Sequence, residues 1–266
     1  MNILIIWGAG KVGSTLAYSL LIHRLHIQEI ILYDINSCVN AYAEELQQVV
    51  LWLWTITKIS SSTELSKVAL CDIVVICSGA SLQSLQTDNR DDLFVTNKAM
   101  IQNIFTDLLY NEQTIFIVVS NPVDIITYCV TQQESIDRDR VLGLSTYTDS
   151  IRLQTIQDWW IFGTHAKDMI AYPEYGNMNA IIQMGVDAVQ SKWWTWFLTA
   201  SLVLSLIVSI LEDQQKIFPI STLLMGEFAC QDICLSVPCI VWKKWIIKRI
   251  EKIYPKLDTF LSSISQ

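Results

Sequence analysis

The amino-terminal half of the chain alternates between short apolar runs and longer amphipathic segments. The runs are apolar throughout rather than alternating with polar residues, which is typical of strands buried on both faces of a parallel sheet. Strands that alternate with helices indicate an α/β fold with a doubly wound sheet. The pattern predicts strands at residues 3–7, 29–33, 71–77, 114–119 and 140–143, and helices at residues 14–21, 40–51, 90–110 and 122–133.

The pattern becomes less regular after residue 143. The predicted elements there are a short helix near Asp149, a strand at 159–162, a long helix from Lys192, a strand-like segment at 217–223 and a terminal helix from about Glu251. This mixture favours a second domain of α+β character, and 266 residues are enough for two hydrophobic cores. We therefore expect one domain at residues 1–144 and another at 145–266.

A glycine-rich turn follows the first predicted strand. Gly8, Gly10 and Gly13 have the spacing G-x-G-x-x-G, and the second strand ends on Asp34, 21 residues after Gly13. In this setting glycines permit a tight turn and let a pyrophosphate approach the backbone at a helix N-terminus, while the acid accepts hydrogen bonds from the ribose. Because a carboxylate repels a 2′-phosphate, the pattern predicts NAD rather than NADP as the cofactor.

Ligands of open parallel sheets bind at the carboxyl ends of the strands. We therefore expect residues 1–144 to form a Rossmann-type NAD-binding domain. The predicted cofactor contacts come from the turn and from strand ends: Gly8, Gly10, Lys11, Val12, Gly13, Asp34, Gly79 and Asn121.

Composition excludes several other classes of function. A formal net charge of −8 and a pI of about 4.8 make a nucleic-acid partner a poor fit. The seven cysteines have no C-x-x-C spacing and there are only three histidines, so we expect no metal site and a reducing compartment. The first residues lack the basic region of a secretory signal, so we expect a cytoplasmic protein.

Residues 193–211 carry no charged side chain and are long enough to span a bilayer. Against a membrane span, the segment contains five serines and threonines, and no second such segment exists. We expect a core or subunit-interface helix here, with a membrane span as the minor alternative.

Several motifs then stand in an informative order. After the glycine turn come residues 120–124 (Ser-Asn-Pro-Val-Asp), 148–153 (Thr-Asp-Ser-Ile-Arg-Leu), 163–165 (Gly-Thr-His) and 235–238 (Leu-Ser-Val-Pro). In this order they resemble the L-lactate/malate dehydrogenase family along nearly the whole chain. The resemblance implies a homodimer or homotetramer that oxidises a 2-hydroxy acid with NAD. It also implies that residues 145–266 form the catalytic domain, which binds the substrate.

The resemblance also implies roles for three catalytic residues. His165 would be the acid/base, because imidazole titrates near the working pH. Asp149 would orient that ring and favour its protonated form. Arg90 would stabilise negative charge that develops on the reacting oxygen.

Other residues would bind the substrate. Arg152 would hold its carboxylate through two parallel hydrogen bonds, Asn121 would bond near the nicotinamide and the substrate oxygen, and Thr195 would line the pocket. Gln83 or Gln86 belongs to a loop, residues 81–89, that has no lysine or arginine. Such a loop favours pyruvate over oxaloacetate, whose second carboxylate would lack a partner.

The motifs also depart from the family pattern. The histidine motif reads Gly-Thr-His-Ala-Lys-Asp instead of a Gly-Glu-His-Gly-Asp type, and only 13 positions separate Arg152 from His165. The predicted function is therefore an NAD-dependent L-2-hydroxy acid dehydrogenase, with L-lactate dehydrogenase first. L-2-hydroxyisocaproate dehydrogenase, malate dehydrogenase and an NAD-binding homologue with little activity stay open as alternatives.

Overall fold

The computed structural model describes residues 1–79, 90–154, 160–165, 168–172, 176–192, 195–243, 248–251, 257, 261 and 263, with the backbone alone at 90–93 and 188–192. Its helices are α1 (Lys11–Ile22), α2 (Val39–Leu53), α3 (Arg90–Asp107), α4 (Val123–Thr131), α5 (Tyr147–Gln154), α6 (Met178–Lys192) and α7 (Trp196–Leu211). Its strands are β1 (Asn2–Ile6), β2 (Glu29–Tyr33), β3 (Lys58–Ser62), β4 (Ile73–Ile76), β5 (Ile115–Val118), β6 (Val141–Gly143), β7 (Trp160–Gly163), β8 (Met169–Tyr172), β9 (Lys216–Met225), β10 (Gln231–Val241) and β11 (Lys248–Arg249).

All of these strands belong to one sheet, in the order β3-β2-β1-β4-β5-β6-β9-β10-β7-β8, with β11 paired to β10. The first six strands run parallel, and their order is that of a doubly wound Rossmann-type fold. The predicted α/β fold is therefore confirmed. Strand direction reverses where Gly143 of β6 meets Ser221 of β9. The division into domains after residue 144 stays a prediction.

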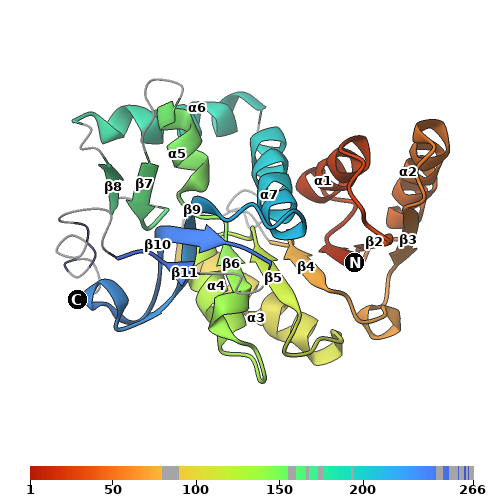
Figure 1. Ribbon diagram of the computed structural model, residues 1–266, viewed down its shortest axis with the longest axis horizontal. Coiled ribbons are helices and arrows are strands. Elements are labelled where there is room, and N and C mark those ends of the chain that lie inside the picture. The colour runs from red at the N-terminus through yellow and green to blue at the C-terminus, as the bar shows by residue number, and fades with distance from the viewer. Residues whose placement is uncertain are drawn as a thin grey trace.

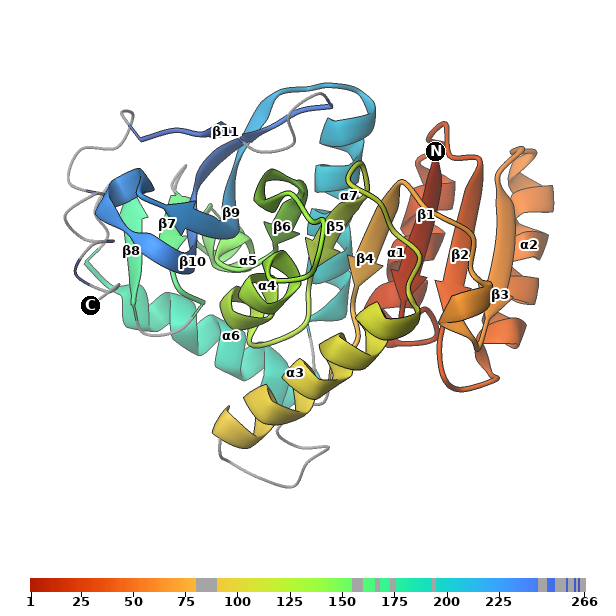
Figure 2. The ribbon, with the colours of Figure 1, turned by 90° about the horizontal axis from the view of Figure 1, so that it is seen from below.

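Helices cover both faces of the parallel part. Figures 1 and 2 show α1, α2 and α7 on one side of the strands and α3 and α4 on the other. Successive strand residues point to opposite faces, so Ile3 and Ile5 of β1 belong to the α1/α2/α7 core and Leu4 and Ile6 to the α3/α4 core. Both cores therefore take apolar residues from each of β1, β2, β4, β5 and β6, which explains the continuous apolar runs of the sequence.

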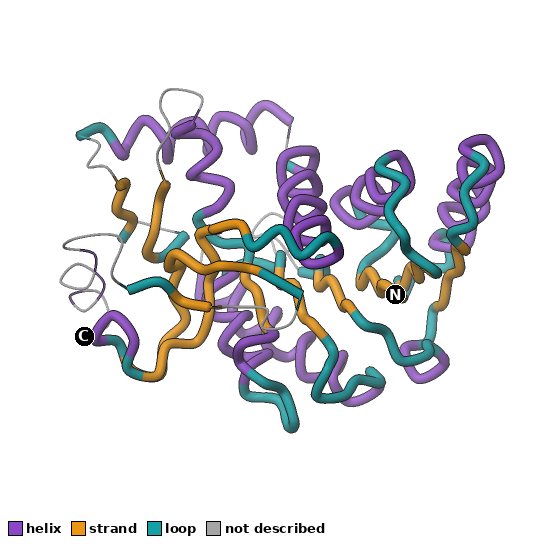
Figure 3. The backbone as a smooth tube through the Cα atoms, in the orientation of Figure 1, coloured by secondary structure: helices purple, strands orange, loops and turns teal. Residues whose placement is uncertain are grey.

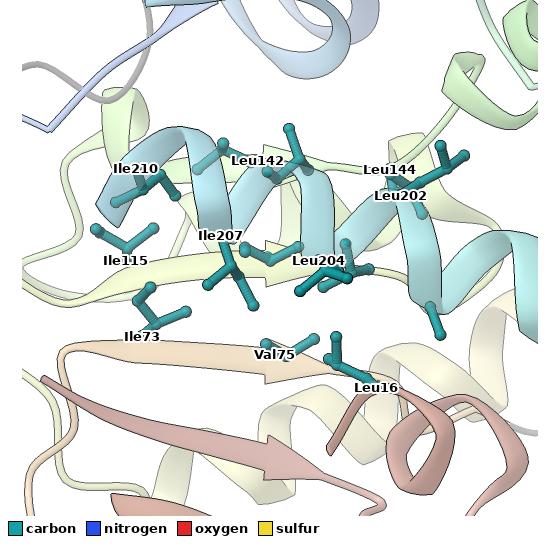
Figure 4. Packing of buried hydrophobic residues seen from close by; sticks show 14 of the residues in the cluster. Leu16, Ile73, Val75, Ile115, Leu142, Leu144, Leu202, Leu204, Ile207 and Ile210 are labelled. Atoms are coloured by element: carbon teal, nitrogen blue, oxygen red, sulfur yellow. The ribbon is translucent and has the colours of Figure 1, made fainter. Parts of the chain in front are cut away.

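Helix α7 carries the long uncharged segment of the sequence. Its apolar side chains pack over β4, β5 and β6, where Ile207 and Ile210 lie above Ile73 and Ile115 (Figure 4). In the described part of the chain, no helix is both long and apolar enough to cross a bilayer. The interpretation of this segment as a core helix is confirmed from Trp196 to Leu211, whereas residues 193 and 194 lie outside the described part.

Some elements were not visible in the sequence pattern. Strand β3 is an edge strand with the polar sequence Lys-Ile-Ser-Ser-Ser, and β10 contains Pro238 within an eleven-residue run. Helix α6 and strand β8 were also not predicted; both lie toward the end of the molecule away from the first three strands (Figure 3). The predicted terminal helix falls mostly outside the described residues.

Candidate active site

The turn between β1 and α1 packs tightly against β2. The backbone N–H groups of Trp7 and Gly8 both donate to the carbonyl of Tyr33, each at 2.8 Å. A Cβ on Gly8 would lie 2.6 Å from Leu32 Cβ, and one on Gly13 would collide with the Trp7 carbonyl oxygen. The left-handed backbone of this turn falls on Trp7 (φ 70°) rather than on Gly8. Gly8 and Gly13 are thus required for close packing. Because glycine has no side chain, neither residue blocks the N-terminus of α1.

Asp34 lies directly after β2 and is 4% exposed. Its Oδ1 accepts a hydrogen bond from the backbone N–H of Asn36 at 3.1 Å. Its Oδ2 is buried and has no hydrogen-bond partner among the residues that the structure describes. A buried carboxylate oxygen that lacks a donor fits the ribose hydroxyls of NAD. The glycine turn, the helix N-terminus and Asp34 together therefore fit the predicted cofactor.

The other predicted cofactor residues lie in the first turn of α1 or follow strands β4 and β5. Lys11 is exposed, and its Nζ lies 4.5 Å from the ring centroid of Trp196 at the start of α7. Val12 is half-buried in the first turn of α1. Gly79 and Asn121 meet at Asn97 of α3, whose Nδ2 donates to the Asn121 carbonyl at 2.5 Å and would lie 3.5 Å from a Cβ on Gly79.

Helix α5 and strand β7 are joined by hydrogen bonds between side chains and backbone. The N–H of Ile161 donates to Ser150 Oγ at 2.8 Å, and Thr146 Oγ1 donates to the Ile161 carbonyl at 2.5 Å. Strand β10 adds Ser236, which pairs with Gly163 and accepts the N–H of Thr146. These bonds fix the helix that carries Asp149 beside the strand that leads to His165.

Asp149 contacts His165, its predicted partner, and also Arg152. Its Oδ2 lies 2.5 Å from His165 Nδ1, and its Oδ1 accepts a hydrogen bond from Arg152 Nη1 at 2.6 Å. The carboxylate is 2% exposed, while the imidazole is one third exposed. With Nδ1–H directed to Asp149, proton exchange falls to the other ring nitrogen, Nε2.

The surroundings of His165 favour its charged form. Burial lowers its pKa, but Asp149, through its charge and hydrogen bond, and Asp124, through its charge, outweigh that effect and the opposing Arg152. The net result is a raised pKa for His165, which favours an imidazolium that can donate a proton.

Arg152 lies between Asp149 and helix α6. A Cβ on Gly185 would be 3.2 Å from Arg152 Nη1 and 3.3 Å from Cζ, so the glycine makes room for the guanidinium. The structure thus adds a contact that the sequence did not predict, since Arg152 was expected to bind the substrate carboxylate and not Asp149. The predicted carboxylate contact stays a prediction.

The structure describes the remaining predicted site residues only in part. Thr195 immediately precedes α7, next to the Lys11–Trp196 contact. Arg90 is the first residue of α3, but its side chain lies outside the described atoms. Gln83 and Gln86 also lie outside the described residues.

Two residues near the site were not singled out from the sequence. Asp124 of α4 accepts the backbone N–H of His165 at 3.0 Å, and Asn97 is fully buried between Gly79 and Asn121. Asp124 belongs to the Asn-Pro-Val-Asp motif, in which an acid follows a strand end and enters the first turn of a helix. That placement was the available signal for Asp124.

A doubly wound sheet with a dinucleotide turn and a histidine–aspartate pair defines an NAD-dependent oxidoreductase. Residues 1–143 match the family model of the lactate/malate dehydrogenase NAD binding domain. The chain therefore belongs to the lactate/malate dehydrogenase family, whose members act on the CH–OH group of a hydroxy acid with NAD as cofactor.

Known malate dehydrogenases and L-lactate dehydrogenases are both similar to this chain. It is 30% identical to a malate dehydrogenase of Cytophaga hutchinsonii, with 92% of this chain and 88% of that protein aligned. It is 27% identical to an L-lactate dehydrogenase of Acetivibrio thermocellus, over 88% of this chain and 84% of that protein. The fold matches the structure of an Archaeoglobus fulgidus malate dehydrogenase in complex with NADH, with a TM-score of 0.86, 23% identity and coverage of 100% and 96% of the two chains.

Proposed function

We propose that the chain interconverts a 2-keto monocarboxylate and the corresponding L-2-hydroxy acid, with pyruvate and L-lactate as the first candidates. The observation that carries the proposal is the Asp149 carboxylate, which bonds His165 on one oxygen and Arg152 on the other. This arrangement brings a proton donor and a carboxylate anchor together on one buried acid.

Each residue has a separate task in the proposed reaction. NAD, when bound, accepts the hydride in oxidation and supplies it, as NADH, in reduction. His165 donates a proton to the keto oxygen in reduction and takes it back in oxidation, because Asp149 keeps Nδ1–H engaged. Arg152 attracts the substrate carboxylate, Asn121 bonds near the reacting oxygen, and Arg90 stabilises the charge that develops there.

The loop at residues 81–89 supports a monocarboxylate. It contains no lysine or arginine, it contains Asp88, and it offers Gln83 or Gln86 to the substrate. Oxaloacetate would bring a second carboxylate, and burying that charge without a partner is costly. The length of the loop also resembles that of L-2-hydroxyisocaproate dehydrogenases, so a bulkier apolar 2-keto acid is included in the proposal.

Malate dehydrogenase is the second candidate. It is favoured by the similarity to the Cytophaga hutchinsonii protein, which is 30% identical and is named a malate dehydrogenase. Under this alternative, a cation from another part of the chain would reach the second carboxylate of the substrate.

Steady-state kinetics with NADH and a panel of keto acids separate the candidates. We expect kcat/KM for pyruvate or 4-methyl-2-oxopentanoate to exceed that for oxaloacetate by at least about tenfold, which requires only about 1.4 kcal/mol of discrimination. A preference for oxaloacetate would select malate dehydrogenase. Binding of NADH without reduction of any keto acid would select an NAD-binding homologue with little activity.

We also propose that the chain forms a homodimer or homotetramer, as the family resemblance implies. The end of α2 and the following turn expose large apolar side chains that a second subunit would cover: Leu51, Trp52, Trp54 and Ile56. Light scattering after size-exclusion chromatography measures the mass directly, and a monomeric mass would overturn this proposal.

A further inference from the structure

His165 is held by two carboxylates that come from different helices. Asp149 of α5 bonds the imidazole ring, whereas Asp124 of α4 bonds the backbone, with its Oδ2 accepting the His165 N–H at 3.0 Å. Asp124 lies in the first turn of α4, where the helix dipole favours a negative charge. The contact spans 41 positions of the sequence.

The surroundings of Asp124 are mostly uncharged and buried. Burial raises the pKa of Asp124 above its usual value, and the nearby Ser221 and Ser145 hydroxyls and the N–H and charge of His165 offset only part of that rise. Within the described residues, Asp124 Oδ1 and both of these hydroxyls are buried and none has a hydrogen bond of good geometry. Only one oxygen of Asp124 is therefore firmly bonded, and its partner is the His165 backbone.

Among the described residues, the charged groups that act on His165 are Asp149 and Arg152 from α5 and Asp124 from α4. The buried thiol of Cys234 on β10 lies near Asp124, and burial raises its pKa well above the usual range. Arg152 already bonds Asp149 and opposes the imidazolium charge. The negative charge of Asp124 acts against that opposition, because it raises the pKa of His165.

We propose that Asp124 is a positioning residue for the proton donor: it fixes the backbone of His165, and its negative charge favours the imidazolium ion. The role of this imidazolium in turnover rests on the proposed function. The contact and its electrostatic effect on the ring do not, so they can be tested without any substrate.

Histidine NMR titration measures this effect directly. The chain has three histidines, and His23 and His26 are exposed near the end of α1, so the His165 resonance is assigned by its loss in His165→Asn. Asp124→Asn keeps an acceptor for the N–H but removes the charge. We expect its His165 titration midpoint to move to lower pH by at least about half a unit, with His23 and His26 unchanged.

Two further variants test whether the shift comes from the charge of Asp124 and from that carboxylate in particular. Asp124→Glu retains the charge and should leave the midpoint above that of Asp124→Asn. Asp187→Asn removes an exposed carboxylate from α6 and should leave the midpoint unchanged. A midpoint in Asp124→Asn equal to that of the unchanged chain, or an equal shift in Asp187→Asn, would overturn the proposal.

A third variant covers the case in which Asp124→Asn does not fold. Ser221→Ala keeps the carboxylate but removes a neighbouring hydroxyl that favours its charged form, and should lower the midpoint in the same direction by a smaller amount. With no shift in a folded Ser221→Ala, the proposal would be rejected. If the NMR shifts appear and no keto acid is reduced, the positioning of His165 stands and the proposed function fails.

Discussion

Asp149 Oδ2 and His165 Nδ1 lie 2.5 Å apart, and the pair joins helix α5 to the end of strand β7. The carboxylate is almost fully buried and also accepts a hydrogen bond from Arg152. A change at Asp149 therefore alters both the charge state of the proton donor and the position of the arginine.

The pH dependence of the reaction follows from this pair. Asp149 raises the pKa of His165, so keto acid reduction, which consumes imidazolium, should be fastest at low pH and fall as pH rises through the raised pKa. Oxidation of the hydroxy acid needs neutral imidazole, so its rate should rise as pH increases through the same pKa. Asp149→Asn should move the fall in kcat/KM for reduction to lower pH, measured as a pH profile beside the Asp187→Asn control. An unshifted profile would mean that another group titrates.

Removing the imidazole tests the identity of the proton donor. His165→Asn should lower kcat for keto acid reduction by at least about a hundredfold, because proton transfer is lost. Binding of NADH should be unchanged, since the predicted cofactor contacts of the glycine turn and Asp34 do not involve this side chain. Fluorescence titration with NADH and steady-state rates on the same preparation give both quantities. Full activity in this variant would assign the proton to another residue.

Local patterns explain what the sequence predicted well. The glycine turn, the strand before it and Asp34 after it lie within one stretch of chain, so spacing alone was sufficient to predict them. Strand β3 was missed because its edge position lets it carry three serines in place of apolar residues.

Contacts between distant segments were harder to predict. The order of Asp149 and His165 indicated a pair, but their contact depends on Ser150 and Thr146 bonding Ile161 of β7. The Asp124–His165 contact joins the first turn of α4 to the end of β7 across 41 positions of the sequence, and no local pattern encodes it.

We expect the choice between NAD and NADP to depend on Asp34. Its buried Oδ2 can accept from a ribose hydroxyl, and its charge would oppose a 2′-phosphate at the same place. Asp34→Ser should reduce the preference for NADH over NADPH by at least about tenfold, because a like-charge contact costs several kcal/mol. The ratio of dissociation constants for the two cofactors measures this. If the unchanged chain binds both with equal affinity, the assignment of Asp34 is wrong.

Gly185 gives a test of Arg152 that leaves the guanidinium itself in place. A Cβ at Gly185 would lie 3.2 Å from Arg152 Nη1 and 3.3 Å from Cζ, so Gly185→Ala should displace the charged group from the position that Asp149 and α6 define. Alanine is favoured over glycine within a helix by about 1 kcal/mol, so thermal stability should not fall.

Gly176→Ala is the matched control, because a methyl group added at Gly176 would have no atom of the described residues within 4 Å of it. We expect KM for the keto acid to rise at least about threefold in Gly185→Ala, with a smaller change in kcat, because a displaced anchor weakens carboxylate binding more than proton transfer. The affinity for NADH should be the same in both variants and in the unchanged chain. Equal KM values for the two alanine variants would show that the substrate carboxylate is bound elsewhere, and the role predicted for Arg152 would be withdrawn.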